Sequence, residues 1–141
     1  MIAADMHVYF AENKVPQNRR LTNLTLLMLG TGVQDSGLLH RGFIPKLKAA
    51  ETGTLLGFAM DILVKKGTGL PRYEDLLAAG TSLVEYYDLM HQAPLVLPLP
   101  VYQSMADACQ RHLLACERAL IGFTPKHHLW MHLVHRFLLF S

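Results

Sequence analysis

The sequence predicts an all-α fold, an irregular antiparallel bundle of five to six helices. Apolar side chains recur at helical spacing in successive segments that proline and glycine separate, and no run alternates apolar and polar residues over the length of a strand. The chain has 141 residues, of which 51% are hydrophobic. A chain of this length buries roughly two thirds of its unfolded surface, enough for a core without disulfides or metal. We therefore expect a single helical domain over residues 1–141.

Two helices and a less regular segment are expected in the N-terminal third. Apolar residues recur at helical spacing over residues 2–13, and this helix ends before Pro16 because the residue preceding a proline disfavours helical geometry. A leucine stripe predicts a second helix over residues 21–30. Residues 31–45 contain three glycines and a proline and show no sustained period, which indicates a loop.

Two longer helices follow, each opened by a proline, which suits the first helical position. Pro45 begins a helix whose apolar stripe continues to Ile62, and Gly67 is expected to end it in the left-handed conformation. Pro71 begins the next helix, which carries two carboxylates in its first turn, where the helix dipole favours them, and continues to about His91.

The C-terminal third combines a proline-rich connector with two further helices. Residues 93–100, APLVLPLP, are expected to be an extended connector, because prolines interrupt a helix, and its leucines are expected to be buried. A fifth helix spans residues 101–121, and Gly122 ends it. Thr124 is a helix N-cap that begins a last helix, which extends to Phe140.

The sequence predicts an intracellular protein without a transmembrane segment. The first ten residues lack a basic residue and a continuous apolar run, and no charge-free stretch offers the ~20 uninterrupted apolar residues that span a bilayer. Cys109 and Cys116 lie seven residues apart in one expected helix, hence about 10 Å apart and beyond the ~7 Å reach of a disulfide. Reduced thiols are typical of intracellular proteins.

Charge is unevenly distributed, which allows a nucleic-acid-binding surface. Residues 13–48 hold six basic residues against one acidic residue, a net charge of +5, whereas residues 49–91 hold three against six, a net charge of −3. A basic stretch of this kind contacts phosphates in nucleic-acid-binding proteins. A solvated surface whose halves partly neutralise each other is the commoner reason for such a pattern. The candidate phosphate contacts are Arg19, Arg20, Arg41, Lys46 and Lys48.

A histidine-rich C-terminus allows a metal site. Three histidines share one face of the last expected helix, and two cysteines and a histidine repeat a similar spacing on the helix before it. These residues are His128, His132, His135, Cys109, His112 and Cys116. Imidazole and thiolate groups are zinc ligands. Because the second set coincides with the apolar stripe that a bundle needs, core packing is the commoner reason for its spacing. We predict no cofactor, and zinc is the metal that this set suits.

The sequence offers no catalytic residue. Glu51 lies within an apolar stripe, and a buried carboxylate needs a partner. The commoner interpretation is a rim residue paired with Lys48 or Arg72, and a catalytic acid or a metal ligand is the alternative. No second carboxylate stands at a recognisable spacing, and nucleophile motifs are absent. The glycine-rich runs GTGV and GTGL follow expected helices instead of the strands that phosphate loops require.

The last expected helix is apolar on nearly every side, and such a helix is buried, either within its own bundle or against another chain. Charged residues make up only 17% of the chain. These features favour a non-catalytic interaction protein, a structural or accessory subunit that binds another chain or itself. The candidate partner-binding residues are Trp130, Met131, Val134, Phe137, Leu138 and Phe140.

Two segments resemble eukaryotic DNA-transposon-like (transposase-derived) open reading frames. FTPKHHLWMHLVHR at 123–136 is similar to a PKHH…H element near the end of their helical region, and PKLKAAETGTLL at 45–56 is similar to an upstream segment. The resemblance implies a helical region beside a nuclease core that uses acidic residues and divalent metal. Only Glu51 matches a family acid, and the chain is too short for the full core. The resemblance therefore implies a nucleic-acid-associated helical domain of mobile-element origin without transposase activity.

Overall fold

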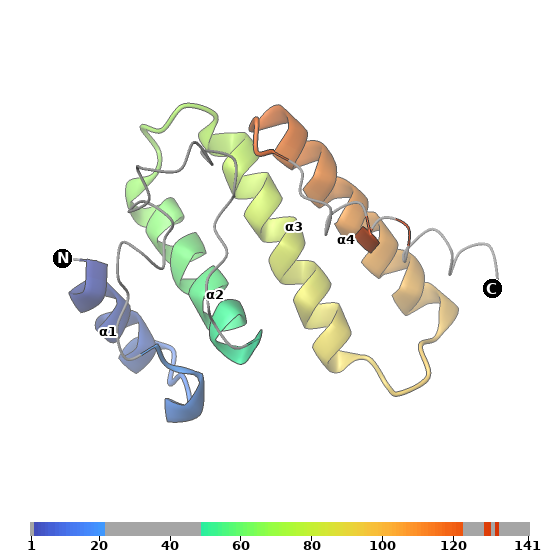
Figure 1. The fold of residues 1–141 in the computed structure, drawn as a ribbon, viewed down its shortest axis with the longest axis horizontal. Helices are drawn as coiled ribbons and strands as arrows, with labels where there is room; N and C mark the ends of the chain where they lie inside the picture. Colours follow the sequence, from blue (N-terminus) through green and yellow to red (C-terminus); the bar gives the residue numbers. More distant parts are fainter. Residues whose placement is uncertain (1, 22–48, 123–128, 131, 133–141) are drawn as a thin grey trace, which may run out of the picture. The chain divides into compact units, whose positions relative to one another are not determined.

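The computed structural model describes residues 2–21, 49–122, 129, 130 and 132 (Figure 1). These residues form four α-helices and one short 3-10 helix and contain no strand, which confirms the all-α class. The chain divides into two compact units, residues 1–59 and residues 60–141, and each is described by itself. The single domain expected from the sequence stays a prediction.

Helix α1 (Ile2–Glu12) is the helix expected over residues 2–13. It ends in a Schellman motif, in which the Val15 N–H donates to the Phe10 carbonyl oxygen over 3.0 Å and the Lys14 N–H donates to the Ala11 carbonyl oxygen over 3.2 Å. Lys14 occupies the left-handed position with φ 49°. Pro16 follows and leads into the short helix η1 (Gln17–Arg19).

The core of the first unit joins α1 to the first part of α2 (Ala49–Lys66). Met6 and Phe10 are buried on α1, and the ring centroids of Tyr9 and Phe58 lie 5.6 Å apart. Gly57 permits this approach, because a Cβ at that position would meet the Tyr9 hydroxyl.

The end of α2 corrects one expectation. Gly67 follows Lys66 directly, as the sequence indicates, but its φ lies outside the left-handed region. A glycine is required there for another reason. A Cβ would meet the carbonyl oxygen of Leu63, which accepts the Gly67 N–H over 2.8 Å.

Helices α3 (Tyr73–Gln92) and α4 (Leu99–Arg118) pack side by side as an antiparallel hairpin in the second unit (Figure 1). Pro71 does not open α3 but lies in the turn before it, because Arg72 adopts a left-handed conformation with φ 60°. The helix α4 begins two residues earlier than expected. Pro100 fits within its first turn, where the backbone N–H has no helical partner to lose.

The expected stop of α4 at Gly122 is wrong. The helix ends at Arg118 in a second Schellman motif, in which the Ile121 N–H donates to the Cys116 carbonyl oxygen over 2.9 Å. The left-handed position belongs to Leu120, with φ 55°. Gly122 comes two residues too late to act as the cap.

Other expected elements fall wholly or partly outside the described residues. The helix over 21–30, the loop over 31–45 and the opening of a helix at Pro45 lie there. In the last expected helix, the described residues Leu129, Trp130 and His132 are helical. None of the described helices combines the length and apolarity that crossing a membrane requires.

Candidate functional site

Small side chains let α3 and α4 approach closely. Ala79 of α3 and Ala115 and Cys116 of α4 form one buried cluster. A second cluster on α4 contains Cys109 and Leu113 with Ala106, and Tyr86 and Trp130 pack against it. The apolar stripe that the sequence places on this helix is therefore the core of the hairpin.

A buried histidine connects the two helices. The Nδ1 atom of His112 lies 2.8 Å from the Ala79 carbonyl oxygen, and Nε2 lies 3.4 Å from the Cys116 Sγ. Because a carbonyl oxygen only accepts, Nδ1 is the donor to Ala79, and Nε2 faces the Cys116 thiol. The imidazole, which the sequence offers as a zinc ligand, is thus engaged on both sides within the fold.

The two thiols are free and belong to different clusters. Burial raises the pKa of Cys109 to about 11 and also raises the pKa of Cys116. Both side chains therefore stay protonated near neutral pH, whereas zinc binds the thiolate. Within the described part of the chain, no three His, Cys, Asp or Glu side chains stand close enough to hold a metal ion. His128 and His135 lie outside the described residues and His132 is exposed, so the zinc site stays a prediction.

Trp130 is the one candidate partner-binding residue whose side chain the structure describes. It is half-buried, with its ring centroid 4.7 Å from that of Tyr86 in an edge-to-face pair and 5.6 Å from that of His112. It packs against its own hairpin. The other candidates lie outside the described residues: Met131, Val134, Phe137, Leu138 and Phe140.

Of the basic candidates, the structure describes two, and both are exposed. Arg19 lies in η1, and the Arg20 Nε donates to the Val15 carbonyl oxygen over 2.7 Å. Arg41, Lys46 and Lys48 lie outside the described residues, as does the side chain of Glu51.

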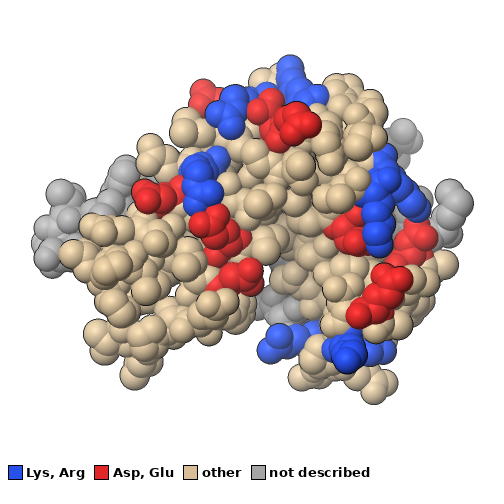
Figure 2. Space-filling view, turned by 180° about the vertical axis from the view of Figure 1, so that it is seen from behind, with Lys and Arg blue, Asp and Glu red and all other residues tan. Residues whose placement is uncertain are grey.

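The connector between α3 and α4 is exposed, which overturns the expectation that its leucines are buried. Leu95 is 103% exposed and Val96 is 81% exposed, and Leu97 and Leu99 extend this apolar surface. No charged residue occurs between Asp88 and Asp107, and the lower left of Figure 2 accordingly shows a broad surface without blue or red atoms. We call residues 93–98, together with the adjoining Leu99 that begins α4, the apolar connector.

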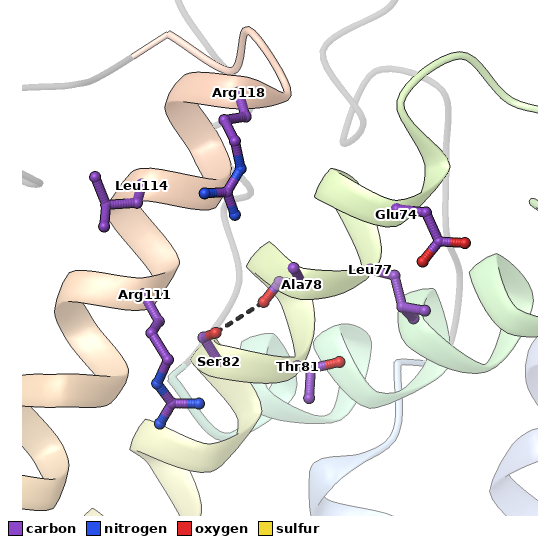
Figure 3. A pocket seen from close by; sticks show the side chains of 8 residues that line it. All are labelled: Glu74, Leu77, Ala78, Thr81, Ser82, Arg111, Leu114 and Arg118. Atoms are coloured by element: carbon purple, nitrogen blue, oxygen red, sulfur yellow. Dashed lines mark hydrogen bonds between the residues drawn. The ribbon is translucent and has the colours of Figure 1, made fainter.

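A groove on one face of the hairpin is a second feature that the sequence alone did not disclose. It has a volume of about 400 Å³. Figure 3 shows Ala78 and Ser82 on its floor, Leu114 on the side of α4 and Leu77 on the side of α3. The remaining residues that line it are Glu74, Thr81, Arg111 and Arg118.

Two ion pairs join α4 to α3, each through an arginine that lines the groove. The Arg111 guanidinium lies 2.8 Å from a Glu85 carboxylate oxygen, and that of Arg118 lies 2.9 Å from an Asp75 oxygen. The hydrogen bond from Arg111 lowers the pKa of Glu85. All four side chains are partly or largely exposed, so each pair orients the helices more than it stabilises them.

The chain matches no protein-family model, no curated protein and no solved structure. The similarity to transposon-derived reading frames therefore stays a prediction.

Proposed function

We propose that this chain is a non-catalytic helical interaction protein, a structural or accessory subunit, and that the apolar connector is its contact surface. The exposure of Leu95 and Val96 carries the proposal. These two adjacent apolar side chains are largely exposed to water, and a partner that covers them gains about 25 cal/mol per Å² of apolar surface removed from water. Contiguous exposed apolar surface is typical of protein interaction sites.

The connector is also prepared for binding by its backbone. Its first residue, Ala93, has φ −69° and ψ 138°, and Pro98 has φ −64° and ψ 144°, both in the polyproline II region. Pro94 and Pro98 restrict the backbone, and the two helices hold the ends. A segment with few conformations to lose binds at a lower entropic cost.

A second proposal concerns the fold of the whole chain. We propose a bundle of five to six helices, in which the expected helices over 21–30 and 124–140 complete the four that the structure describes. Leu129, Trp130 and His132, all helical, support the last of these. Two free, buried thiols support an intracellular location.

Self-association of the full chain tests the proposal. We expect sedimentation velocity at increasing protein concentration to show oligomers, because a second copy covers the connector when the natural partner is absent. The variant Leu95→Ser/Val96→Ser should sediment as a monomer. Val64→Ser/Leu70→Ser removes two apolar side chains that are about half exposed elsewhere, and it should behave as the wild type. A wild-type chain that stays a monodisperse monomer would overturn the proposal.

A second candidate is a nucleic-acid-associated helical domain of mobile-element origin. The net charge of +5 over residues 13–48 and the exposed side chain of Arg19 support it. Affinity for duplex DNA should fall steeply as salt rises, and Arg19→Glu should weaken binding equally for all DNA sequences. Undetectable binding at low salt would dismiss this candidate.

A further inference from the structure

We propose that the groove between α3 and α4 is a docking site for an amphipathic helix of another protein, one that carries Lys or Arg along the edge facing α3. The inference rests on the proposed function only in treating the chain as an interaction protein. The surface and the partner are different: the connector is an apolar loop, whereas the groove selects a helix by shape and charge.

The shape of the groove suits a third helix. Ala78 and Ser82 form a floor without large side chains, which permits the close approach of helices whose axes pack 8–10 Å apart. Leu77 and Leu114 stand on the two sides, and Leu114 is 46% exposed although it lies in the middle of α4.

The floor offers a partner no polar group to satisfy. The Ser82 hydroxyl donates to the Ala78 carbonyl oxygen one turn earlier over 2.8 Å, so its donor is already used. Among the described residues, no buried side-chain nitrogen or oxygen lacks a hydrogen-bond partner. Apolar side chains are therefore the matching contact for Ala78 and Ser82.

The charge of α3 selects the sign of the partner. This helix carries four carboxylates and no Lys or Arg: Glu74, Asp75, Glu85 and Asp88. Arg118 and Arg111 pair with the middle two. Within the described residues, Glu74 and Asp88 have no ion-pair partner.

Helical spacing aligns these unpaired carboxylates with the groove. Glu74 lines it, and Ala78, Thr81, Glu85 and Asp88 follow at intervals of three or four residues on the same face of α3. On α4, Asp107 precedes Arg111 by one turn and acts electrostatically on its guanidinium. The lining itself holds one carboxylate and two arginines, and each arginine is paired with a carboxylate of α3. Together α3 and α4 carry six carboxylates against these two arginines, and this excess of negative charge complements a basic helix and disfavours nucleic acid and anionic lipid. Figure 2 shows acidic and basic side chains interspersed on this side of the molecule.

Peptide binding by the full chain tests the inference. The probe is a fluorescent helix of leucine and lysine, as long as α3, with leucines at i, i+3, i+4 and i+7. One control peptide replaces every lysine with glutamate, and another scrambles the leucine–lysine order. We expect fluorescence anisotropy to detect binding of the patterned lysine peptide only, with an affinity that falls as salt rises.

Variants then locate the binding site. Glu74→Lys should weaken binding roughly tenfold, a change of about 1.4 kcal/mol. Glu117→Lys makes the same charge change on an exposed residue of α4 that does not line the groove, and it should leave the affinity within about twofold. Leu114→Ser should also weaken binding. Circular dichroism of each variant confirms that the helices remain.

The possible results separate the groove from the connector. Equal binding of the lysine and glutamate peptides, or equal effects of Glu74→Lys and Glu117→Lys, would overturn the inference. If Leu95→Ser/Val96→Ser abolishes peptide binding and the groove variants do not, the peptide binds the connector. That result would also overturn the inference, while the proposed function stands. Binding of anionic vesicles or duplex DNA in place of the peptide would show that the groove does not select a basic partner, and it would overturn the inference.

Discussion

The His112 imidazole joins α4 to α3 by donating from Nδ1 to the carbonyl oxygen of Ala79 over 2.8 Å. The Nε2 atom of the same ring lies 3.4 Å from the Cys116 Sγ. One buried side chain therefore satisfies polar groups on both helices at the point where small residues bring them together.

Truncation of this side chain should destabilise the hairpin. His112→Ala removes the hydrogen bond to Ala79 and opens a cavity beside Trp130, whose ring centroid lies 5.6 Å from the imidazole. We expect the free energy of unfolding to fall by about 3 kcal/mol, the sum of a cavity cost and a lost hydrogen bond. Urea denaturation followed by the fluorescence of Trp130, the single tryptophan, measures the change.

The control for this substitution is Gln110→Ala, which truncates an exposed residue of the same helix. Its effect should stay within about 0.5 kcal/mol. A loss in His112→Ala no larger than that of the control would show that the imidazole does not bind Ala79 in solution.

Buried Cys109 should make the fold sensitive to alkaline pH. Burial raises the pKa of its thiol from 9.0 to about 11. Above about pH 9 the unfolded chain releases a proton that the folded chain keeps, so the free energy of unfolding falls between about pH 9 and 11. Below pH 9 the stabilisation is fully present. One thiol contributes a slope of about 1.4 kcal/mol per pH unit.

Urea titrations at several pH values across this window test the effect. The comparison is between the wild type and Cys109→Ala, because tyrosines and lysines titrate in the same range in both proteins. We expect the free energy of unfolding of Cys109→Ala to fall less steeply with rising pH than that of the wild type. Equal slopes would mean that the Cys109 thiol titrates at its ordinary pKa.

The sequence predicts the helices well because their apolar stripes are long and regular. The helix expected over 2–13 matches α1, and the fifth helix, expected over 101–121, matches most of α4. The errors lie at the ends. A proline such as Pro100 is compatible with a first turn or with the residue before it, and the sequence cannot distinguish the two. The left-handed conformation of Leu120 is unusual for a leucine, so Gly122 is the better sequence signal.

The candidate site is less accessible to sequence reasoning because it depends on packing between helices. The spacing of Cys109, His112 and Cys116 fits a core stripe better than a ligand set, but only the position of the Ala79 carbonyl shows how His112 is used. Exposure of the connector is a tertiary property, so the apolarity of Leu95 wrongly indicates burial. The groove exists only once α3 and α4 are paired.

Within the second unit, Gly80 of α3 should show strong energetic coupling to Met60. A Cβ at Gly80 would meet the Sδ of Met60. Alanine favours a helix over glycine by about 1 kcal/mol, but overpacking costs about 1–3 kcal/mol. We expect Gly80→Ala to destabilise the wild type by about 1 kcal/mol and to stabilise the Met60→Ala variant by about 1 kcal/mol. A double-mutant cycle on the free energy of unfolding gives the coupling.

The decisive comparison is the effect of Gly80→Ala in the wild type and in the Met60→Ala variant. If the free energy of unfolding changes equally in both, the alanine Cβ at position 80 does not meet the Met60 side chain. Ala78→Gly, a change in the same turn of α3 on the groove side, serves as the control, and its cost should not depend on Met60.

The left-handed leucine that ends α4 should be replaceable by glycine with a gain in stability. Leu120 has φ 55°, its N–H donates to the Glu117 carbonyl oxygen over 3.1 Å, and its side chain is 71% exposed. A left-handed residue other than glycine costs roughly 1–2 kcal/mol, which the added flexibility of glycine in the unfolded chain partly offsets. We expect Leu120→Gly to raise the free energy of unfolding by about 0.5–1 kcal/mol in urea denaturation. Leu120→Ala keeps the Cβ and the strain, so it should change stability by less than about 0.5 kcal/mol, and equal gains in the two variants would refute the left-handed cap.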